Sequence, residues 1–513
     1  MNHLCNERGV PHGRSNAVNR RDGGAPIAWL RLRACLESGW HGLPARVRRQ
    51  PAAESPGGLV ARRNRPVACS TRHRVFKPAL RDFVARNARQ KLVAVKSNTI
   101  ARLIPVLLTT LTVVAEQPRD SATGPLNAQN LPVVILNSTK PVGSEARVTC
   151  RVTLMPAAGE TTANTNTLTG LIKFHGASSQ GYAKKSFGLA LDESVRWLGM
   201  RKSSHWVLNA AFVDRSLMRH KLAYDLFRSL AREGDPRFAT ASRFVELQLN
   251  GGYHGVYLLM ERLDRSLLEL HRHDSNALTH ACLYKAVDHS ANFGQPGHAG
   301  YEQRDHDGLK VPYWTPMDEF NQFVSRASDA EFFHPETGIA SRLDLGNAMD
   351  FHLLVLLTSN IDGITKNFIL ARDTPTAAVP KPRFFFSVWD YDATFGRSWE
   401  ASRIGHTEWL SNHLFNRLLS NPAYRQKFAA RWRQLREREF SAATISRLID
   451  DNARTLGDAV QRNVARWKSQ NGAYPDRLTF EEDLRQMKAW TGARIQWLNT
   501  EITRQTGVAE KGG

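Results

Sequence analysis

The chain has 513 residues, 42% of them hydrophobic, and a formal net charge of +22, which allows two or three domains with a sizeable apolar core. Most of the charge lies in the first quarter, because residues 1–90 contain 17 Arg and 1 Lys against 5 acidic residues. The 398 residues after position 115 carry only +6 and contain no basic stripe with interleaved aromatic residues. Nucleic acid is therefore not expected as a partner.

Residues 1–90 show no sustained hydrophobic periodicity and are rich in Arg, Gly and Pro. The composition of this basic leader is typical of a disordered tail, and whether the leader belongs to the protein is doubtful. We favour a second interpretation, in which the start codon is placed too far upstream and this stretch is translated non-coding DNA. The reason is the segment that follows it.

Residues 91–115 combine a short basic stretch with an apolar run that ends in Val113 and Ala115, like a signal peptide with its cleavage site. The run is too short to span a bilayer comfortably as a permanent helix. A start near Val93 or Val95 would make the segment N-terminal. We therefore expect a secreted, periplasmic or cell-surface protein without a permanent membrane span; a buried hydrophobic helix or strand is the alternative.

Residues 170–176 and 184–191 have the composition of two strands, and the small-residue turn Ala177–Tyr182 separates them. Backbone N–H groups of such a turn can approach phosphate groups. The candidate phosphate contacts here are two serines of the turn and a lysine pair at the following strand: Ser178, Ser179, Lys184 and Lys185. An ordinary hairpin with an exposed lysine pair is the alternative.

Residues 215–232 place apolar side chains at helical spacing and predict a helix. Asn250-Gly251 then separates two expected strands, residues 244–249 and 255–260, and is a strong signal for a hairpin. Glu261 directly follows the second strand, where protein kinases begin the segment that contacts adenine and ribose.

Residues 265–335 form an expected polar, His-rich insertion or linker, since His residues are frequent between positions 271 and 310. No Cys/His grouping has the spacing of a zinc site, so a polar insertion is favoured over a metal site. Cys150 and Cys282 are the cysteines after the leader; they could pair in an exported chain, but the sequence does not place them near each other.

Two short segments further along carry the strongest chemical signal. In residues 360–367, Asp362 is followed five positions later by Asn367, and in residues 389–396, Asp390 and Asp392 follow an aromatic and β-branched run. Protein kinases use an Asp-x4-Asn loop and a later Asp to receive the acceptor proton and hold Mg²⁺. Each segment alone is more often a turn, or a solvated loop that separates two like charges.

The remaining residues are mostly helical by their apolar period, with helices expected over 412–419, 423–438, 442–468 and 480–503, the last closed by Gly507. Strands, a helix, a hairpin and a helical remainder predict a two-lobed α+β body. Its β-rich N-lobe spans residues 125–264 and its helical C-lobe spans residues 336–510.

In this order the motifs resemble those of the spore-coat-protein-H (CotH) kinase family of atypical kinases, over roughly residues 130 to 500. The matching segments run from the turn and lysine pair to the second acidic loop: Gly176–Phe187, Leu198–Met200, Trp206–Leu208, Asp214–Arg219, Leu222–Asp225, Phe244–Glu246, Asn250–Glu261, Tyr301–Gln303, Asn360–Asn367 and Trp389–Gly396.

The resemblance implies a secreted or surface protein with a two-lobed, atypical protein-kinase-like fold that transfers the γ-phosphoryl group of ATP to Ser or Thr of a protein, with Mg²⁺ or Mn²⁺. It implies that Asp362 is the catalytic Asp, that Asn367 and Asp390 are metal ligands supported by Asp392, and that Lys185 contacts the phosphates.

The turn departs from the family pattern at Ala177 and Gln180, and Phe187 leads into Gly188-Leu189-Ala190 where a basic residue often follows the lysine pair. A weak or inactive kinase-fold protein that acts in surface or coat assembly therefore stays a second hypothesis. A phosphotransferase with a small-molecule or glycan acceptor is a third.

Overall fold

The computed structural model describes residues 131–160, 165–272, 280–304, 312–398, 400, 402–467 and 478–508. Contacts between residues divide the chain into two units, Met1–Thr112 and Val113–Gly513, and every described residue belongs to the second unit. The predicted basic leader and the predicted signal segment lie outside the described residues.

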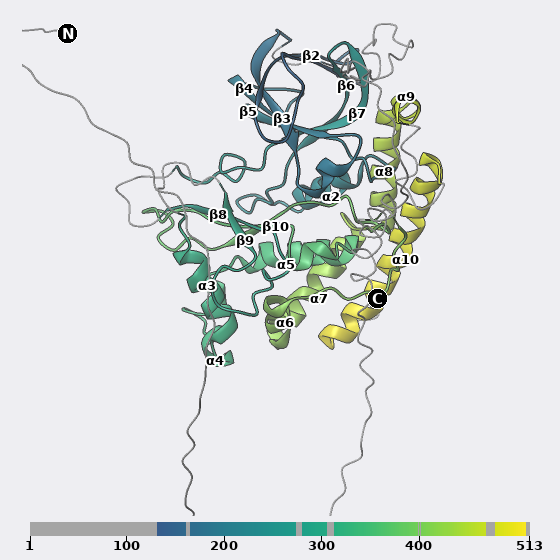
Figure 1. Cartoon of the computed structure of the whole chain (residues 1–513). Helices are drawn as coiled ribbons and strands as arrows, with labels where there is room; N and C mark the ends of the chain where they lie inside the picture. Colours follow the sequence, from purple (N-terminus) through teal and green to yellow (C-terminus); the bar gives the residue numbers. More distant parts are fainter. Residues whose placement is uncertain are drawn as a thin grey trace, which may run out of the picture. The chain divides into compact units, whose positions relative to one another are not determined.

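Seven strands form a closed barrel in the order β1-β2-β3-β4-β5-β7-β6 (Figure 1). Neighbouring strands are antiparallel except β1 and β6, whose parallel pairing closes the barrel. The strands are β1 (Val133–Ser138), β2 (Val148–Met155), β3 (Leu168–His175), β4 (Ser186–Val195), β5 (Ser203–Asn209), β6 (Ser242–Leu249) and β7 (Gly252–Glu261).

Alternation of buried and exposed side chains sets which face of each strand points inward. In β2, for example, Cys150, Val152 and Leu154 are buried, whereas their neighbours along the strand are more exposed. The predicted hairpin is confirmed, because Asn250 and Gly251 both have positive φ angles, 50° and 82°, as a two-residue turn of this kind requires.

Four further strands form a second sheet in the order β11-β10-β8-β9. They are β8 (Cys282–Ala286), β9 (Tyr301–Arg304), β10 (Phe368–Arg372) and β11 (Phe385–Val388), and each neighbouring pair is antiparallel. Residues 265–335, which the sequence predicted as a polar insertion, therefore supply two strands of this sheet. Strand β8, which contains residue 285, therefore lies in the same sheet as β11, the strand that directly precedes the second acidic loop.

The helical part confirms an α+β fold with its helices concentrated toward the C-terminus (Figure 1). The helices are α2 (Arg219–Ser229), α3 (Thr315–Arg326), α4 (Asp329–Phe332), α5 (Leu345–Thr358), α6 (His413–Ser420), α7 (Pro422–Glu437), α8 (Ala442–Leu456), α9 (Ala459–Arg466) and α10 (Phe480–Thr506), with short 3-10 turns η1 (Ser178–Gly181), η2 (Ile339–Ser341) and η3 (Asp362–Ile364). Gly457 splits the single helix predicted over 442–468 into α8 and α9, and Gly507 ends α10 in a left-handed conformation as expected.

Helix α5 is the buried support of the first acidic loop. Apart from its first two residues all of it is buried, which fits its nearly continuous apolar sequence. The Asn347 side chain pairs with β11 by accepting from the Phe386 N–H (2.6 Å) and donating to the Phe386 carbonyl (3.0 Å). The helix ends at Ser359, whose left-handed backbone turns the chain into Asn360 and the loop beyond it.

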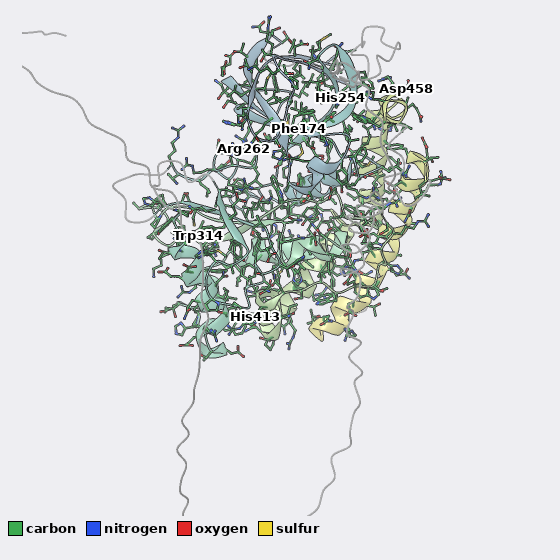
Figure 2. The ribbon with its side chains drawn as sticks, viewed as in Figure 1. Phe174, His254, Arg262, Trp314, His413 and Asp458 are labelled. Atoms are coloured by element: carbon green, nitrogen blue, oxygen red, sulfur yellow. The ribbon has the colours of Figure 1, made fainter. Side chains whose placement is uncertain are left out.

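The barrel is tied to the C-terminal helices through β7 and α9. The ring of His254 lies 5.2 Å from that of Trp467. The labels of His254 in β7 and of Asp458, directly before α9, lie next to each other in Figure 2. Arg462 of α9 also forms two hydrogen bonds of 2.9 Å with buried Glu246 of β6.

Cys150 and Cys282 are both free thiols, and burial raises the pKa of each to about 11. In the parts of the chain that the structure describes, no helix is both long enough and apolar enough to cross a membrane.

Candidate functional site

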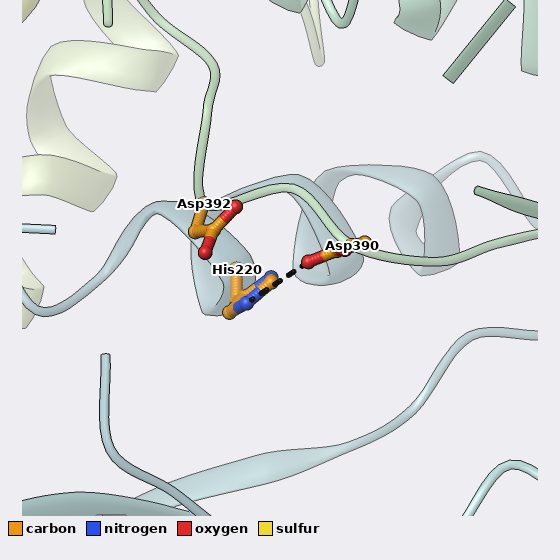
Figure 3. A group of neighbouring side chains, drawn as sticks. All are labelled: His220, Asp390 and Asp392. Atoms are coloured by element: carbon orange, nitrogen blue, oxygen red, sulfur yellow. Dashed lines mark ion pairs between the residues drawn. The ribbon is translucent and has the colours of Figure 1, made fainter. Parts of the chain in front are cut away.

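The loop after β11 brings two carboxylates together. Asp390 and Asp392 lie with His220 of α2 in a group in which one ligand atom from each of the three residues lies within 4.8 Å of the other two (Figure 3). Burial, and then the neighbouring Asp390 carboxylate, raise the pKa of Asp392 to about 7. Such repulsion between two close carboxylates is what a cation bound between them would relieve.

The backbone of this loop is strained and held by side chains from elsewhere. Asp390 has a φ of 60°, a left-handed conformation that costs a non-glycine residue free energy and persists only where its surroundings enforce it. The Asp390 N–H donates to the Tyr224 hydroxyl (3.0 Å), the Asn360 amide donates to the Asp390 carbonyl (3.3 Å), and the Tyr391 N–H donates to His220 Nδ1 (2.9 Å).

The last of these hydrogen bonds decides the role of His220. A backbone N–H can only donate, so Nδ1 must present its lone pair to Tyr391. In the neutral ring the proton is then on Nε2, which faces Asp390 Oδ1 at 3.8 Å. A nitrogen that carries a proton has no lone pair for a metal. We therefore interpret His220 as a residue that positions the loop and the Asp390 carboxylate, and the two aspartates as the candidate metal ligands.

A buried ionic cluster fixes α2 against the same loop and against α10. The Arg219 guanidinium donates to the Thr394 carbonyl (3.0 Å) and pairs with Asp214 (2.5 Å) and Asp483 (2.8 Å), and Arg397 also pairs with Asp483 (3.0 Å). Although burial alone would raise it, the pKa of Asp483 is lowered to about 2, because the two guanidinium groups favour its charged form. The second acidic loop is thus anchored from two helices.

The loop that carries Asp362 is joined to the Asp390 loop through one side chain. Asn360 donates to the Asp390 carbonyl, as described above, and its Oδ1 accepts from the Gly363 N–H (2.9 Å). A Cβ atom at position 363 would lie 2.5 Å from the Asn360 amide nitrogen, so any larger residue there would displace the Asn360 side chain. The structure therefore brings the two predicted acidic segments together.

Asp362 itself lies on η3 and is partly exposed, with 29% of its side chain accessible. Its carboxylate pairs with Lys366 Nζ at 3.0 Å and faces His289 Nε2 at 3.8 Å. Asp362 does not belong to the close group that contains Asp390. Asn367 has a left-handed backbone (φ 56°) and donates its N–H to the Ala286 carbonyl (2.9 Å) of β8.

Both lysines of the predicted pair donate to acceptors within the protein. Lys184 is buried, and its ammonium donates to the Ala210 carbonyl (2.8 Å), to the Val256 carbonyl and to Asn463 Oδ1 (3.1 Å). An ammonium has three donors, so all of them are used within the protein. Lys184 thus links the barrel to α9, and its surroundings leave no donor for a phosphate.

Lys185 braces the turn that precedes it. Its ammonium donates to the Gln180 carbonyl (2.7 Å) and to the Tyr182 carbonyl, which leaves one donor unused by these contacts. Ser178 and Ser179 lie in η1 of the same turn. Gly176 has a φ of 101°, and a Cβ there would lie 2.0 Å from the Ser179 hydroxyl.

The charges of the acidic loop also act on the same turn. Burial and then the charges of Asp392 and Asp390 raise the pKa of Tyr182, so its ring shares the electrostatic environment of the two carboxylates. Glu261, by contrast, is 5% exposed and accepts from the N–H groups of Arg201 (2.8 Å) and Ala241 (3.1 Å). These bonds make Glu261 a brace at the end of β7.

Sequence reasoning missed two residues of this site. The first is Lys285 of β8, whose ammonium lies 4.6 Å from the centre of the Trp389 ring. Trp389 is the residue directly before Asp390. Burial and then Arg304 lower the pKa of Lys285, while Asp390 acts in the opposite direction. No local pattern singles out this lysine. His220 could have been found from the sequence, because it lies four positions before Tyr224 and the two residues therefore share one face of the predicted helix.

The geometry defines an α+β protein in which two acidic loops meet beside a lysine of the second sheet. A family model described as CotH kinase protein matches residues 172–498, and the chain belongs to this family. The chain is also similar to the inner spore coat protein H of Bacillus subtilis (strain 168), with 25% identity over 273 residues, which cover 52% of this chain and 70% of that protein. The resemblance stated from the motifs is thereby confirmed.

Proposed function

We propose that this protein is an exported, metal-dependent phosphotransferase with an atypical kinase-like fold, which moves the γ-phosphoryl group of ATP to Ser or Thr of a surface or coat protein. The observation that carries the proposal is the junction at Asn360, which holds the Asp362 loop and the strained Asp390 loop together. Membership of a family described as kinases, and similarity to a protein named as a spore coat protein, support it.

The donor set suits a hard divalent cation. Asp390 and Asp392 offer carboxylate oxygens, which Mg²⁺ and Mn²⁺ prefer, and Asn367 is the predicted amide ligand. When bound, the cation would neutralise phosphate oxygens of ATP and orient them. His220, Tyr224 and the junction at residue 360 keep the loop in its strained form, so that the carboxylates need not rearrange.

In the proposed reaction, the acceptor hydroxyl oxygen bonds to the γ-phosphorus and the bond from that phosphorus to the bridging oxygen breaks, so ADP leaves. Asp362 receives the hydroxyl proton. Lys366, 3.0 Å from the Asp362 carboxylate, fixes its direction. Lys285 is our candidate for the amine that contacts the phosphates, because the donors of Lys184 are all used within the protein and those of Lys185 largely are.

A second candidate function is a coat or surface assembly protein that is catalytically weak or inactive. It is favoured by one specific observation, the engagement of both predicted phosphate-binding lysines by backbone carbonyl groups. Under this alternative the acidic loops would serve binding and not transfer.

The test is incubation of the full chain with γ-labelled ATP and either Mg²⁺ or Mn²⁺, with the wild type and Asp362→Asn compared on a generic Ser-rich protein. Label transferred by the wild type, and not by the variant, supports the phosphotransferase. Nucleotide binding is measured in parallel, since ATP at about 100 times its Kd stabilises the native state by roughly 2.7 kcal/mol. Absence of both label and stabilisation would contradict the proposal and leave the assembly protein.

A further inference from the structure

The C-terminal end of strand β3 presents two basic side chains on the outside of the barrel. Ile172 is buried in the barrel core and Phe174 packs against that core, so Lys173 and His175, which alternate with them, point outward. A Cβ atom at position 188 would lie 3.6 Å from His175 Nδ1, which places the ring over the outer face of β4. No carboxylate in the described part of the chain pairs with Lys173.

Strands β8 and β9 present a second pair of cations. Their register sets Lys285 opposite Glu302 and Leu283 opposite Arg304, so Lys285 and Arg304 are diagonal neighbours on one face of the sheet. Arg304 pairs with Glu302 at 3.2 Å, but both side chains are exposed, and such a pair holds an arginine only weakly. Lys285 lies over the Trp389 ring and pairs with no carboxylate among the described residues.

The two pairs form one basic patch, which we define by its members on three strands: Lys173, His175, Lys285 and Arg304. Burial, and then the charges of Lys285, Arg304, Arg262 and Lys173, lower the pKa of His175 to about 4. Since β8 and β9 supply two of these charges, the outer face of β3 lies close to the second sheet. Like charges gathered in this way repel one another, and bound carboxylates would relieve the repulsion.

Strand β8 connects the patch to the proposed catalytic loop. Lys285 lies over Trp389, directly before Asp390, and His289, four positions after Lys285, faces Asp362 with 3.8 Å between Nε2 and Oδ1. Four residues of extended chain span at most about 14 Å. A chain whose hydroxyl reaches Asp362 can therefore place side chains about four positions away on the patch.

From this arrangement we propose that the basic patch binds an acidic segment of the acceptor protein, in which Glu or Asp residues lie about four positions from the Ser or Thr that receives the phosphoryl group. As a statement about the acceptor, this inference rests on the proposed function. The carboxylates contact Lys173 and Arg304, and Lys285 lies at the boundary with the nucleotide phosphates. The sequence does not reveal this surface, because its cations come from three strands that are far apart in the chain.

The experiment measures binding of fluorescent peptides to the full chain at low salt by anisotropy. Each peptide has one central Ser, flanked by Ala, with a run of Glu, of Gln or of Lys that begins about four positions away on both sides. The Glu peptide should bind at least about tenfold more tightly than the Gln peptide, and the Lys peptide should bind most weakly. Equal or tighter binding of the Gln or the Lys peptide would overturn the proposal.

Changes of single charges locate the binding surface. Lys173→Glu, and Arg304→Gln as a milder change, should each weaken binding of the Glu peptide at least about fivefold. The matched control is Lys427→Glu, because Lys427 is an exposed lysine of α7, which contributes no residue to the patch. Lys427→Glu should leave binding unchanged. Equal effects of Lys173→Glu and Lys427→Glu would show that overall charge holds the peptide, and would overturn the assignment.

Two further measurements on the wild type separate this surface from the nucleotide and from phosphotransfer. Saturating ATP with Mg²⁺ should not compete with the Glu peptide, and competition would assign the patch to the nucleotide and overturn the proposal. Labelled ATP should phosphorylate the Glu peptide with a kcat/KM at least about tenfold above that of the Gln peptide. Equal transfer to both would overturn the acidic acceptor and leave the phosphotransferase. Binding of the Glu peptide without any transfer would support the binding surface and contradict the phosphotransferase.

Discussion

Substitution of the buried Lys184 can show whether this lysine stabilises the fold or binds the nucleotide. Lys184→Met would remove the donor from the Ala210 and Val256 carbonyls and from Asn463 Oδ1. Each buried acceptor left unpaired costs about 1–3 kcal/mol, and near pH 7 and below part of this is offset because the variant no longer buries a protonated amine. We expect a net loss of stability of about 2 kcal/mol, with ATP binding unchanged.

The loss should depend on pH in a defined direction. Burial lowers the pKa of Lys184 to about 7, from 10.5 for an ordinary lysine. Between these values the unfolded chain binds a proton that the folded chain does not, so this group makes stability rise with pH across the window and fall as pH drops toward 7. The limiting slope is about 1.4 kcal/mol per pH unit, so from about pH 7.5 to about pH 9.5 the wild type should gain on the order of 2 kcal/mol relative to Lys184→Met.

The assay is urea denaturation of the full chain, followed by tryptophan fluorescence at several pH values, with the exposed Lys140→Met as the matched control. The difference between wild type and Lys184→Met removes the contribution of other titrating groups. Parallel pH profiles for the two proteins would refute the reasoning. So would a Lys184→Met variant of normal stability that has lost ATP binding, which would return this lysine to the phosphates.

Three further predictions concern the site. Lys285→Met should raise the KM for ATP at least about tenfold with unchanged folding, measured by steady-state kinetics, and an unchanged KM would exclude phosphate contact. His220→Leu should weaken Mn²⁺ binding, and His220→Gln, whose side chain keeps a hydrogen-bond acceptor and a donor, should largely restore it. Pulsed electron paramagnetic resonance of Mn²⁺ bound to the wild type should show no directly coordinated ring nitrogen. Detection of such a nitrogen would make His220 a metal ligand. Gly363→Ala should lower the free energy of unfolding by about 1–3 kcal/mol, because the added methyl group meets the Asn360 side chain. A free energy of unfolding equal to that of the wild type, measured by urea denaturation, would contradict this close approach.

Local patterns in the sequence predicted most of the individual elements. The two-residue hairpin turn at Asn250-Gly251, the helix over 423–438 and the stop at Gly507 depend on nearby residues alone, and each is confirmed. The closure of the barrel could not be predicted in this way, because it rests on parallel pairing of β1 with β6 across more than 100 residues.

The same distinction applies to the candidate site. The acidic residues Asp362, Asp390 and Asp392 stand out by spacing, and the structure places them on two joined loops. The lysines were harder to assign, since a Lys-Lys pair after a turn looks the same in sequence whether its ammonium groups face a ligand or a carbonyl. Lys285 comes from a sheet strand more than 100 positions before Asp390, and only the folded chain brings it to Trp389.

The most direct test of the central claim is phosphoryl transfer by the full chain carrying Asp390→Asn, an uncharged side chain of nearly the same shape. Loss of one group that stabilises developing charge commonly lowers the rate by about 10²–10³. The account predicts a loss of at least this size in label transfer from ATP, together with weaker Mn²⁺ binding and an unchanged unfolding midpoint. Label transfer at the wild-type rate by Asp390→Asn would contradict the assignment of this loop as the metal site of a phosphotransferase.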